Sequence, residues 1–426
     1  MIRHAAAKRG TLKTKLFDTV IIGGEDNYCA ERFSYSQSSD GVRASYTPMP
    51  FAPFLYVPDA ILAQYLPNLD RLFAVDSSGN HYRWHPIDQD VPRKFGTLTN
   101  ERTFVVGCYF NKAQAYAVFS GKQCYVAEPN GGTRTMIDTA FHCGDWHKGR
   151  AFLRDELDPF KIVWSGRKVN NVKSDGTVYG SGYIQINPKG GPVQNIIEYG
   201  ERLYLVRELA ISEFVAPGDP RHFRVVTNTK FSLPKVHSDS AVICGGKLWV
   251  YTDNGIYSFN GGAVNCEYRG ECKKYTVTGA ISYEERFIYY NAEKDGVKML
   301  LEYDTEKKVL TPFAKNFFGV FWMKQGLYAF YSNVGHQFKL GVEDPDRIWV
   351  SKPINFNNDK SKTLKSISVE GDGNLNIKIV SGGVERNLTG TGEIPVNLRG
   401  KSFTFTLTGA CNVYKLAAHW EATHGV

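Results

Sequence analysis

The chain has 426 residues, of which 42% are hydrophobic, 13% aromatic and 22% charged, and its formal net charge is +8. This length allows an extensive buried core and two or three domains, and no apolar run is long enough to cross a bilayer. The charge is moderate for the length, which argues against a dedicated sequence-reading DNA-binding protein. Frequent aromatics, with 41 Gly and 18 Pro, indicate a protein of many short strands.

Residues 1–67 form the first part of the chain, an irregular N-terminal arm. Its first basic residues precede any acidic residue and are Arg3, Lys8, Arg9, Lys13 and Lys15. They indicate either an arm that docks on a neighbouring subunit or on nucleic acid, or a solvated tail that orders only on assembly, and we favour the tail. No apolar core follows them, so we expect no signal peptide and a product that starts in the cytoplasm.

The end of this arm combines a strand-closing segment with the one predicted helix. The Pro-rich apolar stretch 46–58 is typical of a piece that wraps a β-propeller or closes its last blade by lending it a strand. The next residues predict a helix over Asp59–Leu66, because Asp59 can cap its start, Pro67 ends it, and apolar residues at 61, 62, 65 and 66 form a stripe. We expect this helix to be a local cover.

Residues 68–342 repeat one short phrase seven times: an aromatic-rich apolar run, a polar turn and a second apolar run. The first runs begin at Leu72, Tyr116, Ala151, Leu203, Leu248, Phe287 and Leu327. Their spacing of roughly 35 to 52 residues is near the length at which a four-stranded propeller blade recurs. An open sheet of so many strands would expose long edges, whereas radial closure leaves only short ones. We therefore predict a six- or seven-bladed β-propeller.

Residues 343–426 change to a cleaner alternation of apolar and polar residues with tight Gly-containing turns. The alternating apolar residues include Ile367 and Val369, Ile377 and Ile379, and Phe403 and Phe405. Four to six such strands predict a small β-sandwich, either a separate domain or a cap on the face of the propeller. The expected fold class is therefore all-β, with an irregular N-terminal arm, a propeller and a small C-terminal β-sandwich.

The common motifs of catalysis and metal binding are missing from the sequence. It has no Gly-rich phosphate loop, no Gly-x-Ser-x-Gly nucleophile turn and no His-Glu-x-x-His metal helix. None of the eight cysteines lies in a Cys-x-x-Cys motif, and we expect them to be reduced and mostly buried, with Cys266 and Cys272 the only close pair. We predict no catalytic, cofactor-binding or metal-ligating residue, no cofactor and no enzymatic activity.

Three groups of residues still invite a catalytic interpretation. The fragment 174–179 is near a sialidase Asp box, but it occurs once and lacks the Trp, so a hairpin turn explains it better. Asp155, Glu156 and Asp158 could be imagined as an acid/base pair, yet an Asp-Pro turn accounts for them with fewer assumptions. His142 and His147 lie on either side of Trp146, where hydrogen-bonded packing residues are the simpler expectation.

Three successive stretches within residues 140–262 share a detailed pattern. The first combines 146–150 with 158–165, the second combines 190–194 with 201–206, 211–214 and 217–219, and the third combines 238–242 with 245–249 and 253–261. In the third, a Ser precedes Gly245-Gly246-Lys247-Leu248-Trp249. These stretches resemble successive hairpins of bacteriophage tail hub and nozzle proteins of the tail tubular, portal-stabilisation type. The chain departs from that group in its short length and its discrete C-terminal sandwich.

The resemblance implies a structural virion protein of a phage tail or neck, made in the host cytoplasm. Several copies would form a homo-oligomeric ring around the DNA channel and join other tail or neck proteins, and genomic DNA would pass without sequence-specific binding. Two other classes stay open. One is a host-receptor or carbohydrate-binding propeller at the tail tip that stacks sugars on exposed Tyr and Trp, and the other is a tail-borne glycan hydrolase.

Overall fold

A computed structural model shows how these segments fold. It describes residues 18–422 except 23–26, 32, 36–41, 45–46, 58–59, 67–70, 85–92, 100, 112, 129–130, 174, 176–179, 227–230, 271, 307, 324–325, 332–333, 340–347, 352, 357–358, 374 and 410. Within this part, helix is confined to short turns such as η3 (Pro220–His222) and η5 (Cys272–Lys274). No helix among these residues has the length and apolar character needed to cross a bilayer.

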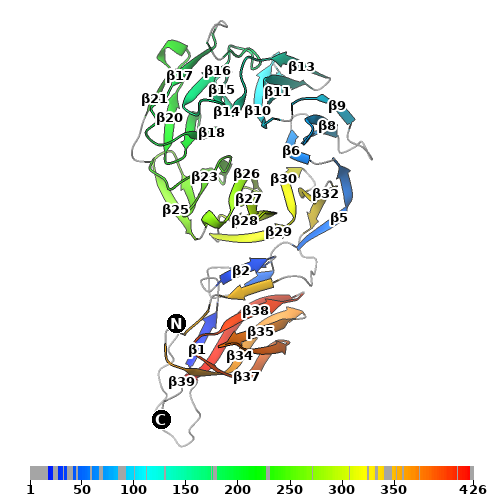
Figure 1. The fold of residues 1–426 in the computed structure, drawn as a ribbon, viewed down its shortest axis with the longest axis vertical. Helices are drawn as coiled ribbons and strands as arrows, with labels where there is room; N and C mark the ends of the chain where they lie inside the picture. Colours follow the sequence, from blue (N-terminus) through cyan, green and yellow to red (C-terminus); the bar gives the residue numbers. More distant parts are fainter. Residues whose placement is uncertain are drawn as a thin grey trace, which may run out of the picture. The chain divides into compact units, whose positions relative to one another are not determined.

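Seven four-stranded sheets form a ring in the part of the chain that the structure describes (Figure 1). We call them blades 1 to 7. Blade 1 contains β6 (Ala60–Leu66), β7 (Arg71–Asp76), β8 (Asn80–Trp84) and β9 (Arg93–Thr97). Blade 2 contains β10 (Thr103–Phe110), β11 (Ala113–Ser120), β12 (Gln123–Glu128) and β13 (Gly131–Met136). Blade 3 contains β14 (Phe141–His147), β15 (Arg150–Asp155), β16 (Lys161–Trp164) and β17 (Gly182–Gln185).

Blades 4 to 7 continue the same order. Blade 4 contains β18 (Val193–Tyr199), β19 (Arg202–Arg207), β20 (Ile211–Val215) and β21 (Arg224–Val226), and blade 5 contains β22 (Val242–Cys244), β23 (Lys247–Thr252), β24 (Gly255–Phe259) and β25 (Val264–Arg269). Blade 6 contains β26 (Thr276–Tyr283), β27 (Phe287–Lys294), β28 (Val297–Asp304) and β29 (Val309–Lys315). Blade 7 contains β30 (Phe317–Met323), β31 (Gly326–Tyr331), β32 (Val334–Lys339) and β5 (Thr47–Tyr56). The first strand of each blade lies nearest the axis of the ring and the fourth lies outermost (Figure 1).

Each of the seven apolar phrases of the sequence lies on the second strand of a blade. These strands are β7, β11, β15, β19, β23, β27 and β31. A second strand has a partner on both sides in its own sheet and packs both faces against neighbouring blades, so it takes apolar side chains almost without alternation. In β15, for example, Leu153 packs in a cluster with residues of blade 2, while Phe152 packs in a cluster with residues of blade 4. The predicted propeller is confirmed, with seven blades.

The predicted helix over Asp59–Leu66 is wrong, because residues 60–66 form β6, the inner strand of blade 1. A register shift between Ala60 and Leu62, where β6 pairs with β7, breaks strict alternation. Both faces of the strand are also apolar: Tyr65 packs in a cluster with blade 7, and Leu66 packs in a cluster with blade 2. A bulged strand that is buried on two sides therefore imitates the apolar stripe of a helix.

The last blade is completed by a strand from the other end of the chain. β5 lies beside β32 as the outer strand of blade 7, and it comes from the stretch expected to lend a strand. Ring closure by a distant strand stabilises the circle, because opening it would cost a complete ladder of backbone hydrogen bonds.

The remaining strands form the small β-sandwich. One sheet has the order β1 (Asp18–Ile22), β39 (Cys411–Ala422), β34 (Lys362–Gly373) and β37 (Gly392–Gly400). The other has the order β2 (Asn27–Glu31), β33 (Ile348–Ser351), β38 (Thr404–Thr408), β35 (Asn376–Ser381) and β36 (Val384–Thr389), and β3 (Phe33–Tyr35) pairs with β4 (Val42–Ala44). Ile367, Leu407 and Trp420 belong to the core between the sheets. The N-terminal arm is thus more regular than its sequence indicates, since β1 and β2 are sandwich strands.

The chain divides into two compact units. Residues 50–301 and 315–337 form one unit, which holds most of the propeller. The other unit contains the described residues of 18–49, 302–314 and 338–422, which include the sandwich. All residues of the candidate site below belong to the first unit.

Candidate functional site

The inner strands of the blades surround a cavity of about 930 Å³. Its walls come mainly from the inner strands β6, β10, β14, β18, β26 and β30 and from the segment before β22, with further residues from β11, β27 and β28. One part of the wall is aromatic: Trp322 of β30 meets Tyr65 of β6 edge to face with ring centroids 5.7 Å apart, and Lys298 Nζ lies 4.5 Å from the ring centroid of Phe318. Charged and amide side chains, among them Glu101, Asn291 and Glu293, share the wall with the aromatic residues. A concave site with both kinds of group can hold a small molecule.

A polar group of five residues lies at one end of these inner strands, and we call it the axial cluster. Its members are Arg102, His142, Glu156, Ser238 and Asp239. Arg102 precedes β10 in blade 2 and forms an ion pair with Asp239, which precedes β22 in blade 5. Arg102 Nε also donates to the carbonyl oxygen of His142 in blade 3 (2.6 Å). The ion pair connects blades that are not neighbours in the ring.

His142 lies at the centre of the axial cluster. Its Nε2 is 3.0 Å from Ser238 Oγ, and its Nδ1 is 3.2 Å from Glu156 Oε2, without the alignment of a hydrogen bond. Burial, together with the nearby Arg102 and Arg154 guanidinium groups, lowers the pKa of His142 to about 3. The imidazole is therefore neutral at neutral pH, and its Nε2 can accept a proton from the Ser238 hydroxyl.

Arg154 gives this region a fixed positive charge. It lies on β15, it is 8% exposed, and its Nε has no hydrogen-bond partner among the residues described. Burial lowers its pKa, opposed by Cys143 and Glu156. An arginine nevertheless stays charged in proteins, so Arg154 keeps a cation beside His142.

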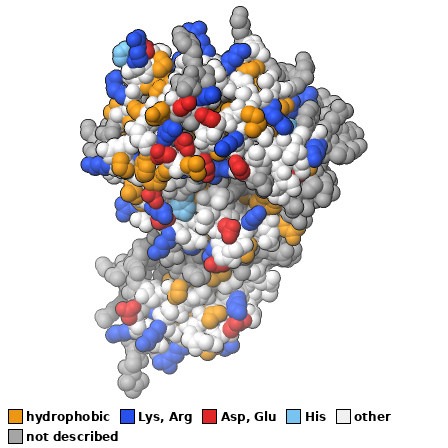
Figure 2. Space-filling view, turned by 45° about the horizontal axis from the view of Figure 1, so that its top comes forward, with side chains coloured by type: hydrophobic (Ala, Val, Ile, Leu, Met, Phe, Trp, Pro, Cys, Tyr) orange, Lys and Arg blue, Asp and Glu red, His pale blue; other side chains and the backbone are white. Residues whose placement is uncertain are grey.

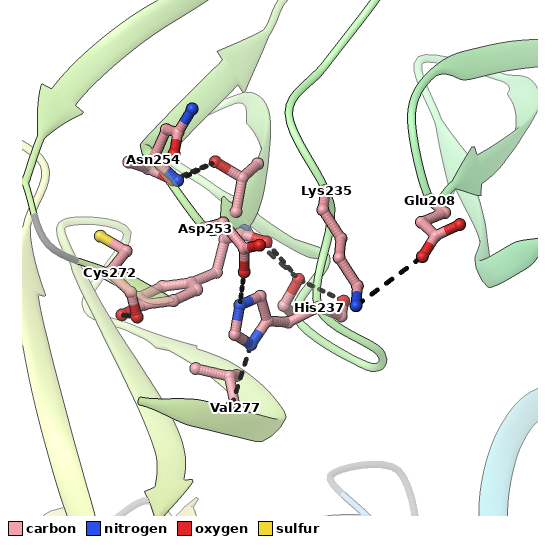
Figure 3. Close-up of polar contacts among 11 residues, drawn as sticks. Glu208, Lys235, His237, Asp253, Asn254, Cys272 and Val277 are labelled. Atoms are coloured by element: carbon pink, nitrogen blue, oxygen red, sulfur yellow. Dashed lines mark hydrogen bonds and ion pairs between the residues drawn. The ribbon is translucent and has the colours of Figure 1, made fainter. Parts of the chain in front are cut away.

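A second histidine ties three blades together at the same end (Figure 3). His237 Nδ1 accepts a hydrogen bond from the Val277 N–H (3.2 Å), and His237 Nε2 lies 2.9 Å from Asp253 Oδ1. Since Nδ1 is the acceptor, Nε2 carries the proton and donates to the carboxylate. Burial lowers the pKa of His237 although Asp253 opposes this. Lys235 Nζ is 4.0 Å from Glu208 of blade 4. This arrangement fixes loops and leaves no free nucleophile or base.

The three acidic residues considered as an acid/base pair, Asp155, Glu156 and Asp158, have two different roles in the structure. Asp155 Oδ1 accepts from the N–H groups of Leu157 (3.0 Å) and Asp158 (3.3 Å), and Asp158 Oδ1 accepts from the Phe160 N–H (3.0 Å). These bonds confirm the turn for both aspartates. Glu156 belongs to the axial cluster instead. Of the Asp-box fragment, residues 174 and 176–179 lie outside the described part.

His147 and the cysteines have packing roles. His147 is 2% exposed, its Nδ1 lies 3.4 Å from Glu198 Oε1, and its ring contacts Phe152. The six cysteines whose side chains are described are free, and burial raises the pKa of Cys108 to about 12 and of Cys272 to about 11. Cys266 and Cys272 do not pair. The side chains of Cys29 and Cys411 lie outside the description. Within the described residues, no group of three or more acidic, His or Cys side chains is placed to hold a metal ion.

Sequence reasoning noticed His142 and Glu156 but missed Arg102, Ser238 and Asp239 as their neighbours. Ser238 and His142 are 96 residues apart, and Arg102 and Asp239 are 137 apart. No short-range spacing in the sequence therefore predicts that these residues form a cluster. The one local signal is the turn at Ser238-Asp239, in which Asp239 has a left-handed φ of 56°.

Comparisons with known proteins give remote likenesses only. Neither a protein-family model nor a curated protein matches the sequence. The β-propeller domain of Myceliophteria thermophila Cps50 (Swd1) is 10% identical, with a TM-score of 0.48 over 68% of this chain and 98% of that chain. Kluyveromyces lactis Hsv2 is 12% identical, with a TM-score of 0.38 over 60% of this chain and 85% of that chain. The fold assignment therefore depends on the strand pairing itself.

Proposed function

We propose that the protein is a structural component of a phage tail or neck, in which several copies form a ring around the DNA channel and join neighbouring tail proteins. The observation that carries this proposal is the order of the nozzle-like stretches in residues 140–262. They fall on three consecutive blades, 3, 4 and 5. The first covers the turn between β14 and β15 and strand β16, the second contains most of β19 and β20, and the third contains the start of β23 and all of β24.

The outer strands of consecutive blades support lateral assembly. β13, β17 and β21 are the outermost strands of blades 2, 3 and 4 (Figure 1). They expose Met136 (67%), Tyr183 (49%) and Val226 (38%). Large apolar side chains and open strand edges on the rim of a ring are suited to contact with a second copy. Head-to-tail contacts between identical subunits close into a larger ring when the rotation between them allows it.

The axial cluster defines where DNA would pass in this arrangement. The ion pair between Arg102 and Asp239 connects blades 2 and 5 at the end of the cavity, so a duplex could not thread the axis of one subunit. The DNA channel would lie between subunits. Figure 2 shows Lys and Arg side chains interspersed with acidic and apolar ones on the visible face, with no continuous basic patch. Such a surface favours DNA that slides without adhering.

Size-exclusion chromatography with light scattering and electron microscopy of the purified full chain test the proposal. We expect a concentration-dependent oligomer that appears as a ring with a central opening. Met136→Asp and Tyr183→Asp should shift it toward monomer, because each places a charge in an apolar contact. Val297→Asp on β28, at a residue that is also exposed (39%), is the matched control and should assemble normally. A particle that is monomeric at every concentration would contradict the proposed ring.

One observation favours carbohydrate binding at the tail tip as a second candidate. Trp322 lines the cavity, is 38% exposed and is supported edge to face by Tyr65. A supported indole with an open face can stack on a sugar ring. Glycan-array binding by the protein, abolished by Trp322→Ala and retained by Tyr331→Ala at another exposed aromatic, would support this candidate. If the array shows no binding, the carbohydrate-binding candidate is contradicted and the structural role is the only one left.

A further inference from the structure

We propose that Ser238, His142 and Glu156 form a nucleophilic triad that hydrolyses small carboxylic esters at the end of the axial cavity. This activity goes beyond the proposed structural role and does not depend on it. It also departs from the expectation that the chain has no catalytic site. The inference rests on His142 and Glu156, which lie close together on blade 3, and on Ser238, which is 96 residues from His142 and is brought to it by the ring of blades.

The three side chains stand in the order that a serine nucleophile needs. Ser238 Oγ lies 3.0 Å from His142 Nε2, which is hydrogen-bond distance between nucleophile and base. Glu156 Oε2 lies 3.2 Å from the other ring nitrogen, Nδ1. A carboxylate there holds the tautomer in which Nε2 is free to accept a proton. Alignment of such contacts often improves only when substrate is bound, and Glu156 is 36% exposed and free to adjust.

The turn that carries Ser238 presents it with nearby groups for a developing negative charge. Asp239, the next residue, has φ 56°, a left-handed conformation that aspartate adopts in tight turns. The N–H of Asp239 donates to no acceptor among the described residues. Arg102 pairs with Asp239, whose carboxylate Oδ2 is 3.3 Å from Ser238 Oγ. The unused N–H is the group beside the nucleophile that would stabilise an oxyanion, whereas the Arg102 guanidinium neutralises the nearby Asp239 carboxylate.

Space for a substrate adjoins the triad. Arg102, Cys143 and Asp239 line the cavity of about 930 Å³. His142 is neutral at neutral pH and can accept a proton, but its pKa of about 3 makes it a weak base, so we expect slow turnover. The competing interpretation is a polar tie between blades, in which the Ser238 hydroxyl donates to Asp239 Oδ2 and carries out no chemistry. Chemical reactivity at Ser238 distinguishes a nucleophilic triad from this structural contact between blades.

The reaction would follow an acyl-enzyme course. Ser238 Oγ attacks the ester carbonyl carbon while its proton passes to His142 Nε2. The bond from carbon to the alcohol oxygen then breaks, and the alcohol leaves with the proton from His142. Water attacks the acyl-serine, gives its proton to His142, and releases the carboxylic acid as the proton returns to Ser238. The sum is one ester and one water converted to one acid and one alcohol.

Labelling of the full chain with an alkyl fluorophosphonate tests the triad. In this step an Oγ–P bond forms, the P–F bond breaks, fluoride leaves and the serine proton goes to His142. We expect one adduct on the native protein, mapped by mass spectrometry to Ser238, and slow hydrolysis of p-nitrophenyl acetate. Ser238→Ala should abolish both, whereas Ser77→Ala, at an exposed serine in the turn after β7, should change neither.

Substitutions of the other two residues separate catalysis from folding. His142→Gln should lower the labelling rate at least about 100-fold. Glu156 acts through His142 as a positioning residue, so Glu156→Gln should slow labelling about tenfold, and Glu156→Asp should recover part of the rate. Glu156 is half-exposed, so these two variants should fold even if His142→Gln does not. Native protein without an adduct, an adduct at another residue, or a labelling rate of Glu156→Gln equal to that of wild type would each overturn the proposal.

Discussion

His81 provides a quantitative test of how burial sets the acid stability of the propeller. It is 1% exposed on β8, and its ring lies 5.8 Å from the Phe73 ring centroid and 5.0 Å from that of Tyr125. Burial, and then the charges of Arg83 and Arg134, lower its pKa to about 4. In the unfolded chain the same group titrates near 6.5. The folded protein therefore binds this proton less tightly than the unfolded chain does.

The sign and size of the effect follow from this difference. Above pH 6.5 both states are neutral at His81 and the residue contributes nothing to the pH dependence. Below pH 6.5 the unfolded chain gains the proton and the folded protein does not, so stability falls as the pH falls, until the folded pKa near 4 is reached. At pH 5 the loss from this residue is about 2 kcal/mol. His142, with a pKa of about 3, adds a loss of similar size.

The measurement has to isolate His81, because other groups contribute with the opposite sign. Burial raises the pKa of Asp145 to about 6, so that group stabilises the fold as the pH falls. We therefore compare wild type with His81→Phe, which keeps a ring in place and removes the titration. Urea unfolding followed by circular dichroism gives the free energy of unfolding at pH 8 and at pH 5.

The loss of stability between these two pH values should be smaller in His81→Phe by about 2 kcal/mol. The control is His222→Phe at an exposed histidine, which should lose as much stability as wild type. If His81→Phe and wild type lose the same free energy, the argument from burial is wrong.

Three further predictions concern packing, the axial cluster and the thiols. Phe152→Ala, which removes a fully buried ring 5.2 Å from that of Phe214, should lower the free energy of unfolding by about 3–5 kcal/mol in thermal or urea unfolding. A double-mutant cycle of Arg102→Ala and Asp239→Ala should give a coupling energy of about 1 kcal/mol, and a cycle without coupling would contradict the ion pair across the ring. Among the six described cysteines, half-buried Cys266 should alkylate first with iodoacetamide in peptide mapping, since burial raises the pKa of the others.

The propeller was predictable because its strongest pattern is local. The phrase that starts at Leu203, for example, becomes β19, in which five consecutive residues are buried. Residues 60–66 escaped the same reasoning, since burial on both faces and a bulge hide the period of a strand. β1 and β2 escaped it too. Their partners β39 and β33 are more than 300 residues away in the sequence, so no hairpin turn between the paired strands is available to predict them.

The candidate site was predictable only in fragments. His142 and Glu156 were visible in the sequence as a histidine near an aromatic residue and as part of an acidic turn. Nothing in the spacing connects either of them with Ser238, because their contact depends on three blades that curve around one axis. The turn at Asp155 was predictable, since an aspartate that binds the N–H groups following it is a local arrangement.

The pairing of the earliest strands with the latest ones constrains how a ribosome can produce this protein. β1, β2 and β5 are translated long before their partners β39, β33 and β32, from which they are far apart in the sequence. Neither the circle nor the sandwich can be completed until these distant partners have been translated, so the early strands wait with open edges during most of synthesis. Open edges favour pairing between neighbouring nascent chains, so efficient production should favour conditions that keep those chains apart.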